Sequence, residues 1–234
     1  MSTVKRGSTF WLSITGLLCS IFFLAGQYYA GSQTSASIPF LHSIKARRTY
    51  YALSDTLPFG KETVVEIVQD LVQDVPSAFN SQSNRVVVLF DQEHGKFWDT
   101  VSHALKNVVA EDQWEATSGR ISMFKAAAGS VLFFVDEAVV QEFTANIPAY
   151  ADSFPVWAAE SGGMLQHSAW TALEAKGLGA NLQHYNLVNE EIAKVWNLPA
   201  TWRLNAQLVI GGRTGGPGEK TFKPLSEKLK VFGA

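Results

Sequence analysis

The hydrophobic and polar positions divide the chain into an apolar N-terminal segment and a body of alternating helical and strand patterns. Phe10 to Gly26 is a nearly continuous apolar run, and no charged residue occurs between Gly7 and Ile44. A bilayer-spanning helix needs about 20 residues, with a lower limit of about 17. We therefore predict that residues 1–37 form a separate hydrophobic anchor or targeting segment, and that residues 38–234 form one folded domain.

Three explanations of the apolar segment compete. A signal anchor fits its length and polarity, whereas a cleaved secretory peptide is disfavoured because the apolar run is long and Tyr28 interrupts the small-residue pattern before Ala30. A mitochondrial presequence fits the lack of acidic residues, but arginine is scarce and the segment is not amphipathic. We expect membrane association through this single segment, at a mitochondrial or endoplasmic-reticulum membrane.

The body alternates short β-branched runs with longer stretches of helical periodicity. The apolar residues of 61–75 recur on one helical face, and Pro76 ends that helix. Interleaved helices and strands, without an Asn-Gly hairpin signal, favour an α/β or α+β sandwich over a β-barrel. Helices are predicted at 38–52, 61–75, 96–109, 137–143, 163–177 and 188–196, and buried strands at 85–90, 130–135 and 203–210.

The composition excludes several classes of function. The formal net charge is −2 and the 19 Lys and Arg residues are scattered, whereas a nucleic-acid-binding surface needs them clustered. The only cysteine, Cys19, lies in the apolar segment, and no Cys/His spacing resembles a zinc site. A Gly-x-Ser-x-Gly elbow, a Walker loop and a His-Glu-x-x-His motif are also absent. We therefore expect no nucleic-acid partner, no metal site and no nucleophile of a known motif.

Two polar segments in the first half of the body are candidates for ligand binding. Lys45 to Thr49 combines adjacent arginines with a hydroxyl, which can clamp a phosphate through bidentate hydrogen bonds. A basic patch that faces lipid phosphates next to a membrane explains the same spacing equally well. In Pro76 to Ser83, Asn80 and Gln82 can hydrogen-bond the edge of a heterocycle, although ordinary turn chemistry also accounts for such a loop.

Two further candidates are rich in glycine. Gly177 to Tyr185 permits close backbone approach to a flat ligand, whereas a helix C-cap explains Gly177 alone. The loop from Gly211 to Lys223 carries Lys220 and Lys223 where they can reach an anion, and a solvated surface loop is the simpler interpretation.

Taken together and in this order, the four segments resemble the nitroreductase superfamily, and more narrowly its fungal branch of nitroreductase-like proteins of oxidative stress and lipid signalling. The most specific match is V-P-S-A-F-N-S-Q-S-N-R-V-V-V-L-F (75–90) followed by H-G-K-F-W-D (94–99). The resemblance covers about residues 38–234 and is completed by A-R-R-T-Y-Y-A-L-S (46–54), G-L-G-A-N-L-Q-H-Y-N (177–186), L-P-A-T-W (198–202) and K-T-F-K-P-L (220–225).

The resemblance implies an α+β fold, a nitroreductase-like α/β sandwich with a central mixed sheet wrapped by helices. It also implies a homodimer that binds one FMN per subunit in clefts at the interface. Each implied FMN contact is carried over by position in the matching motifs. These contacts are Arg47, Arg48, Thr49 and Lys220 at the phosphate and ribityl chain, Asn80 and Gln82 along the isoalloxazine and ribityl, and the backbones of Gly179 and Ala180 near the ring.

The activity that the resemblance implies is that of an FMN-dependent NAD(P)H oxidoreductase, which reduces nitroaromatic, quinone or related acceptors in an oxidative-stress response. NADH or NADPH would deliver a hydride to flavin N5 and be replaced by the acceptor in the same pocket, so no acid–base residue is needed. The alternative is a flavin-binding stress or lipid-signalling regulatory protein with weak or no turnover. A cytoplasmic location, as in related members, is the alternative to the membrane.

Some positions refine this expectation. Tyr51 and Phe222 stand where the wider superfamily often has arginine, so the implied phosphate site is less positive here and Lys223 is a candidate replacement. Phe79, Trp157 and Trp170 are candidates to line the acceptor pocket, although core packing is the commoner role of such aromatic residues.

Overall fold

The computed structural model describes residues 38–233, and its contacts divide the chain into two units, Met1–Ala46 and Arg47–Ala234. In the first unit, the described residues form helix α2 (Pro39–Ala46). The predicted anchor at 1–37 lies outside the described residues, so the anchor and the boundary at residue 37 remain predictions. Within residues 38–233, none of the helices has the length and apolar character needed to cross a membrane.

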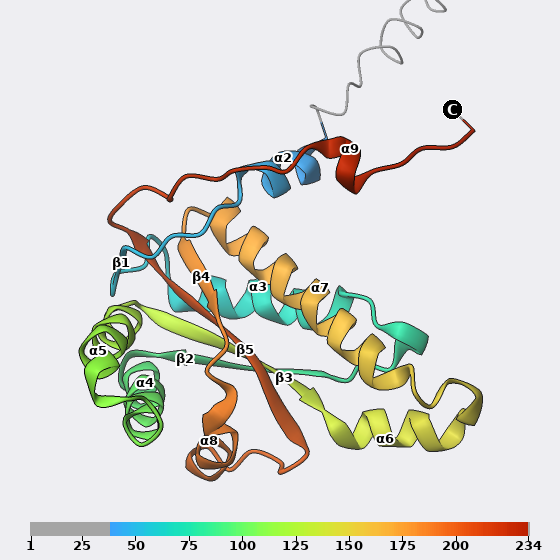
Figure 1. The fold of residues 1–234 in the computed structure, drawn as a ribbon, viewed down its shortest axis with the longest axis horizontal. Helices are drawn as coiled ribbons and strands as arrows, with labels where there is room; N and C mark the ends of the chain where they lie inside the picture. The colour runs from blue at the N-terminus through green and yellow to red at the C-terminus, as the bar shows by residue number, and fades with distance from the viewer. Residues whose placement is uncertain (1–37, 234) are drawn as a thin grey trace, which may run out of the picture. The chain divides into compact units, whose positions relative to one another are not determined.

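The second unit is built on a five-stranded sheet (Figure 1). Strand β5 pairs with β1, β3 and β4, and β2 lies beyond β3. The strands are β1 (Leu53–Ser54), β2 (Asn84–Phe90), β3 (Gly129–Asp136), β4 (Gly179–Gln183) and β5 (Trp202–Arg213).

Every pairing of these strands is antiparallel, where the resemblance implied a mixed sheet. Helices α4 (Asp91–Lys106) and α5 (Glu111–Lys125) both lie between β2 and β3. Strands that run in the same direction, β2 with β5 and β3 with β4, are separated in the sheet by a strand of the opposite direction, so they never pair directly.

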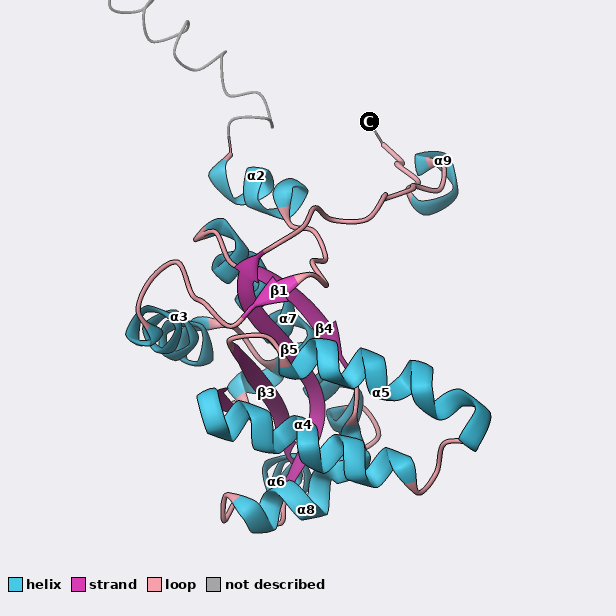
Figure 2. Cartoon of the chain, turned by 90° about the vertical axis from the view of Figure 1, so that its left-hand side faces the viewer, coloured by secondary structure: helices cyan, strands magenta, loops and turns pink. Residues whose placement is uncertain are grey.

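Helices cover both faces of the sheet. Helices α4, α5 and α8 (Asn189–Val195) pack on one face, and α3 (Lys61–Asp74) and α7 (Phe154–Ala175) pack on the other (Figure 2). Side chains of β3 alternate between the two cores: Leu132 and Phe134 face the first helices, and Val131 and Phe133 face the second. The remaining helices are α6 (Glu137–Asn146) and α9 (Leu225–Lys228). The α+β class and the sandwich of helices around a sheet are thus confirmed.

Several predicted elements have different limits in the structure. The helix expected at 38–52 ends at Ala46, and the helix expected from residue 163 begins at Phe154. Residues 179–183, for which the sequence predicted no strand, form strand β4 beside β5, and Gly179 lies where no Cβ fits between neighbouring side chains. Helix α5 is not indicated by the sequence pattern, since its buried residues, Ile121 and Phe124, lie only near its end.

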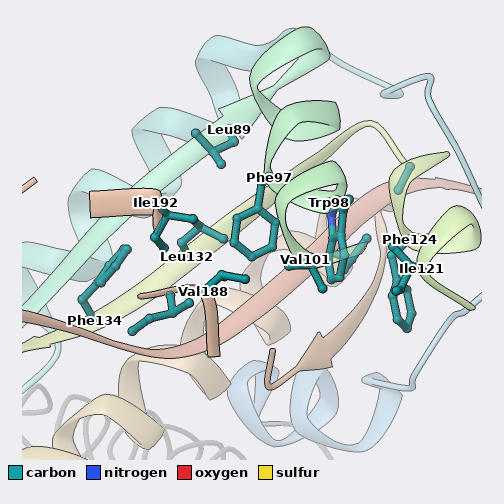
Figure 3. Packing of buried hydrophobic residues seen from close by; sticks show 13 residues of the cluster. Leu89, Phe97, Trp98, Val101, Ile121, Phe124, Leu132, Phe134, Val188 and Ile192 are labelled. Carbon is teal, nitrogen blue, oxygen red and sulfur yellow. The ribbon is translucent and has the colours of Figure 1, made fainter. Parts of the chain in front are cut away.

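A buried hydrogen-bond network ties α4 to β3 within the first core, where Phe97, Trp98 and Val101 of α4 are packed (Figure 3). The Nδ1 of His94 lies 3.0 Å from Ser130 Oγ, and its Nε2 lies 3.2 Å from the Phe124 carbonyl oxygen. The indole N–H of Trp98 donates to the same Ser130 oxygen at 3.1 Å. Because a carbonyl only accepts, Nε2 carries the proton and the Ser130 hydroxyl donates to Nδ1.

We predict that this network makes stability depend on pH. Burial lowers the pKa of His94 in the folded chain. As the pH falls through the unfolded value of about 6.5, the unfolded chain therefore takes up a proton that the folded chain rejects. The free energy of unfolding should decrease between about pH 7.5 and about pH 5.5, by at most ~1.4 kcal/mol over this range.

Urea denaturation at both pH values measures this effect. The decrease should be smaller in His94→Gln than in the wild type. It should persist in His103→Gln, which changes an exposed histidine of the same helix. An equal pH dependence in the wild type and His94→Gln would contradict the prediction.

Candidate functional site

The segment Arg47 to Tyr50, which is neither helix nor strand, runs beside β4 and the C-terminal end of α7. The Tyr50 amide donates to the Ala180 carbonyl and the Asn181 side-chain amide donates to the Tyr50 carbonyl, each at 2.9 Å. The Arg48 amide donates to the Glu174 carboxylate, also at 2.9 Å. These bonds replace those that a helix would make, which explains why the predicted helix at 38–52 is shorter.

The Arg47 guanidinium has an unusual environment. Its central carbon lies 4.3 Å from the centre of the Trp170 ring, which is the geometry of a cation–π contact. Its Nη1 is buried and has no hydrogen-bond partner among the residues that the structure describes. A buried donor without an acceptor costs about 1–3 kcal/mol, and more when it is charged. This position therefore suits an anionic acceptor that is not part of the chain.

The other predicted phosphate ligands gather around the same segment. The Arg48 guanidinium donates to the Gly218 carbonyl, two residues before Lys220. This contact fixes the glycine-rich tail next to the arginines. Lys220 itself is exposed, and its ammonium lies 5.2 Å from the centre of the Phe222 ring. The structure thus brings together the segments that carry Arg47, Arg48, Thr49 and Lys220, and we call these four residues the phosphate clamp.

A buried carboxylate lies directly behind the clamp. The Glu174 side chain is 4% exposed and accepts the Trp170 indole N–H at 2.6 Å as well as the Arg48 amide. Burial raises the pKa of Glu174, while the hydrogen bonds from Arg48 and Trp170 and the charges of Arg213 and Arg47 oppose that rise. The two hydrogen bonds and the two guanidinium charges thus favour the ionised form of Glu174, whereas its burial opposes that form.

Arg213 of β5 connects the clamp to the end of α7. Its guanidinium donates to the carbonyl of Glu174 in the last turn of the helix and to the carbonyl of Leu178 just beyond it. Gly177 ends the helix with a φ of 102°, and the bonds from Gly177 to Glu174 and from Leu178 to Leu173 complete a Schellman motif. The helix C-cap proposed for Gly177 is thus confirmed.

Gly179 and Ala180, which were predicted to approach the flavin ring, have close neighbours within the chain. A Cβ at Gly179 would lie 2.6 Å from Leu53 Cδ2 and 3.1 Å from Tyr50 Cβ. Ala180 is fully buried, and its carbonyl accepts the Tyr50 amide. Packing within the chain accounts for both residues, and their contact with a flavin ring remains a prediction.

The loop with Asn80 and Gln82 has an uncommon backbone. Phe79, Asn80 and Gln82 have φ values of 55°, 52° and 50°, in the left-handed region that non-glycine residues seldom occupy. The exposed Phe79 ring stacks on Trp157 at the start of α7, with ring centres 5.7 Å apart. Such strain persists only where the surroundings enforce it, and it is often found at ligand sites.

The loop and the clamp lie at opposite ends of α7. Trp157 marks the loop end and Trp170 marks the clamp end, and their 13-residue separation corresponds to roughly 20 Å along the helix. Figure 1 shows α7 running from the neighbourhood of α6 to that of β4. The structure therefore does not bring Asn80 and Gln82 to the clamp of the same chain.

Sequence reasoning missed two residues of the clamp surroundings. Glu174 and Arg213 were not singled out, although both contact the residues that were. A signal for Glu174 does exist: it is the one charged residue among the buried residues of α7, four residues after Trp170. A lone carboxylate among buried residues requires donors nearby.

A comparison with known protein families identifies the fold. The model of the nitroreductase family matches residues 44–212. The chain belongs to the nitroreductase family. HBN1 of Saccharomyces cerevisiae is 41% identical over 201 residues, which cover 85% of this chain and 99% of HBN1. The resemblance to the fungal nitroreductase-like branch is thereby confirmed.

Solved structures agree with this assignment to the nitroreductase family. The nitroreductase CinD of Lactococcus lactis, solved with chloramphenicol, superposes with a TM-score of 0.76 at 40% identity, over 82% of this chain and 99% of CinD. A more distant structure from Desulfovibrio desulfuricans, solved with FMN, has a TM-score of 0.61 at 19% identity, over 84% of this chain and 99% of that one. The second comparison shows the fold alone. Family membership makes the chain a nitroreductase-like oxidoreductase.

Proposed function

We propose that this oxidoreductase is an FMN-dependent homodimer that takes electrons from NADH or NADPH and passes them to nitroaromatic, quinone or related acceptors, in an oxidative-stress response. The observation that carries the proposal is the buried Nη1 of Arg47, which lacks an acceptor within residues 38–233 and lies beside Arg48 and the Lys220 segment. A flavin phosphate supplies the missing acceptor oxygens, and guanidinium groups bind phosphate with charge-assisted hydrogen bonds.

When bound, FMN supplies the hydride- and electron-transfer chemistry. The chain's own residues would hold and orient it: Arg47, Arg48 and Lys220 at the phosphate, with Thr49 beside them. Burial and the Arg47 charge lower the pKa of the imidazole of His167, three residues before Trp170. The FMN complex of the distant Desulfovibrio relative and the chloramphenicol complex of CinD support this cofactor and an aromatic acceptor.

An exposed stripe of α7 supports the homodimer. Val156 and Met164 are 56% and 42% exposed, and Ala159 and Gly163 lie between them on the same side. A Cβ at Gly163 would meet nothing within 4 Å, so a second helix could approach closely here. The tail after Arg213 also exposes large apolar side chains, as expected of a segment that a second copy covers: Phe222, Leu225, Leu229, Val231 and Phe232.

A two-fold dimer through this stripe would join the separated halves of the site. Gly163 and Met164 lie midway between Trp157 and Trp170. An axis at that point makes the two α7 helices antiparallel, so the Trp170 end of one subunit lies beside the Trp157 end of the other. The phosphate clamp of one subunit would then meet Asn80 and Gln82 of the partner subunit, which would supply the amide contacts to the ring.

The localisation part of the proposal rests on the sequence alone. Residues 1–37 would tether the oxidoreductase to a membrane of the mitochondrion or endoplasmic reticulum. Alkaline extraction of membranes tests this: retention of the full chain in the pellet supports the tether, and release into the supernatant favours the cytoplasmic alternative.

The visible spectrum of the purified full chain tests the catalytic proposal. Under anaerobic conditions we expect flavin absorbance that bleaches on adding NADPH or NADH and returns on adding a nitroaromatic compound or a quinone. Tightly held FMN that neither nucleotide bleaches would instead favour the regulatory alternative. A colourless protein that takes up no added FMN would contradict both functions.

A further inference from the structure

The phosphate clamp contains no rigid element of its own, because Arg47 to Tyr50 is an extended segment. Its position must therefore come from the groups that contact it. On the side of α7 these groups are Glu174 and Trp170, four residues apart on one helical face. Neither residue is among the FMN contacts that the proposed function uses.

We propose that Glu174 and Trp170 are positioning residues for the flavin phosphate site, which fix the Arg47–Arg48 backbone and aim the Arg47 guanidinium. This inference rests on the proposed function, because the ligand is the FMN phosphate. It assigns a role to a buried carboxylate whose negative charge would otherwise only weaken an anion site.

The hydrogen bonds of Glu174 show how the carboxylate can act. One oxygen accepts the Arg48 amide at 2.9 Å and the other accepts the Trp170 indole at 2.6 Å, while Arg213 lies 3.9 Å away. Both oxygens are therefore occupied by donors of the chain. The carboxylate fixes the backbone between the two arginines, and the Arg47 Nη1 remains without a partner in the described part of the chain.

Trp170 provides the second constraint. Its N–H is held by Glu174, and its ring lies under the Arg47 guanidinium at 4.3 Å. Stacking on an indole restricts a guanidinium to the plane parallel to the ring. A restricted guanidinium loses less freedom when it binds phosphate, which improves affinity by preorganisation.

Two opposing effects make Glu174→Gln a decisive variant. Removal of the negative charge alone should tighten FMN binding. Glutamine, however, keeps only one acceptor oxygen for the two donors from Arg48 and Trp170, so one buried donor is left facing an amide N–H. Leaving a buried donor unpaired costs more than a partly screened charge repulsion, and we expect the dissociation constant for FMN to rise about tenfold.

The full chain is stripped of flavin and titrated with FMN and with riboflavin, following the quenching of flavin fluorescence. Riboflavin lacks the phosphate, so its dissociation constant should stay within about twofold of the wild-type value. Trp98→Phe is the control, because it removes a comparable buried indole donor in the opposite core. It should lower the melting temperature and leave the affinity for both flavins unchanged.

A second pair of variants tests the contact between Arg47 and the Trp170 ring. This test remains possible even where the Glu174→Gln variant does not fold. Trp170→Phe keeps an aromatic face under Arg47, whereas Trp170→Leu removes it. The loss of FMN affinity should be larger for leucine than for phenylalanine and absent for riboflavin. Equal losses in the two variants would overturn the stacking role.

The remaining outcomes separate this inference from the proposed function. FMN binding by Glu174→Gln that is unchanged or tighter than in the wild type would overturn the positioning role and leave the proposed function intact. Equal losses for FMN and riboflavin would show a general structural defect and overturn it as well. A wild-type chain that binds neither flavin would contradict the proposed function itself.

Discussion

Replacing both Arg47 and Lys220 with alanine is expected to give a folded protein that no longer retains FMN. Hydrogen bonds to charged groups contribute about 1.5–3 kcal/mol each, so the loss of two raises the dissociation constant by about two to four orders of magnitude. The stability of the flavin-free protein should respond differently. Because the Arg47 Nη1 is buried without a partner among the described residues, its removal should offset the lost contact with Trp170, and the melting temperature should change little.

This combination of lost affinity and retained stability identifies a ligand site rather than a structural ion pair. The measurements are the flavin content of the purified protein, titration with FMN, and thermal unfolding of the flavin-free form. Lys106→Ala combined with Lys194→Ala is the matched control, because it removes the same charge from exposed positions on α4 and α8. Unchanged flavin content in the Arg47/Lys220 variant would refute the assignment of the clamp.

The sequence predicted the parts of the fold that have a clear periodicity. Helix α3 and strands β2 and β3 lie within two residues of the predicted limits, since their apolar residues recur at the helical or strand spacing. The first half of α7 was missed because, apart from Phe154 at its start, its buried face is made of the small residues Ala158, Ser161 and Gly162, which give little hydrophobic signal. Adjacent glycines at 162 and 163 also disfavour a helix unless tertiary packing supplies the stability.

Strand β4, in the glycine-rich segment after α7, was not predicted from the sequence for a related reason. Glycines usually indicate a loop, but Gly179 and Gly211 are opposite one another in the β4–β5 pair. A Cβ at Gly211 would lie 2.3 Å from the Ser54 carbonyl oxygen. The lack of a side chain is thus required by the packing of β1 against β5, and only the paired strands reveal this.

The sequence predicted which residues could bind a phosphate, but it did not predict which of the candidate residues lie close together. The motifs pointed to the arginines of the clamp and to the Lys220 segment, which the structure brings together. Pattern alone could not show that Asn80 and Gln82 lie at the far end of α7, because their distance from Arg47 depends on the length and direction of that helix. It also could not show Glu174 behind the clamp, since burial is a tertiary property.

A single arginine on the exposed stripe of α7 should abolish FMN binding, although the substituted position is not one of the predicted FMN contacts. Gly163 is fully open in the chain, and arginine favours a helix over glycine by roughly 0.5–1 kcal/mol, so Gly163→Arg should fold at least as well as the wild type. At the centre of an antiparallel α7 pair, however, two arginines would meet across the axis. Their volume and repulsion should prevent the close approach of the helices.

We expect Gly163→Arg to be a monomer by sedimentation velocity and to lose FMN, because Asn80 and Gln82 of the partner subunit are then missing. Gly119→Arg is the matched control, since Gly119 is also an exposed helical glycine with nothing within 4 Å of its Cβ position. It should remain a dimer with bound flavin. A dimeric Gly163→Arg protein would place the interface elsewhere. A monomer that binds FMN as tightly as the wild type would mean that one chain completes the site, which would contradict the two-subunit arrangement.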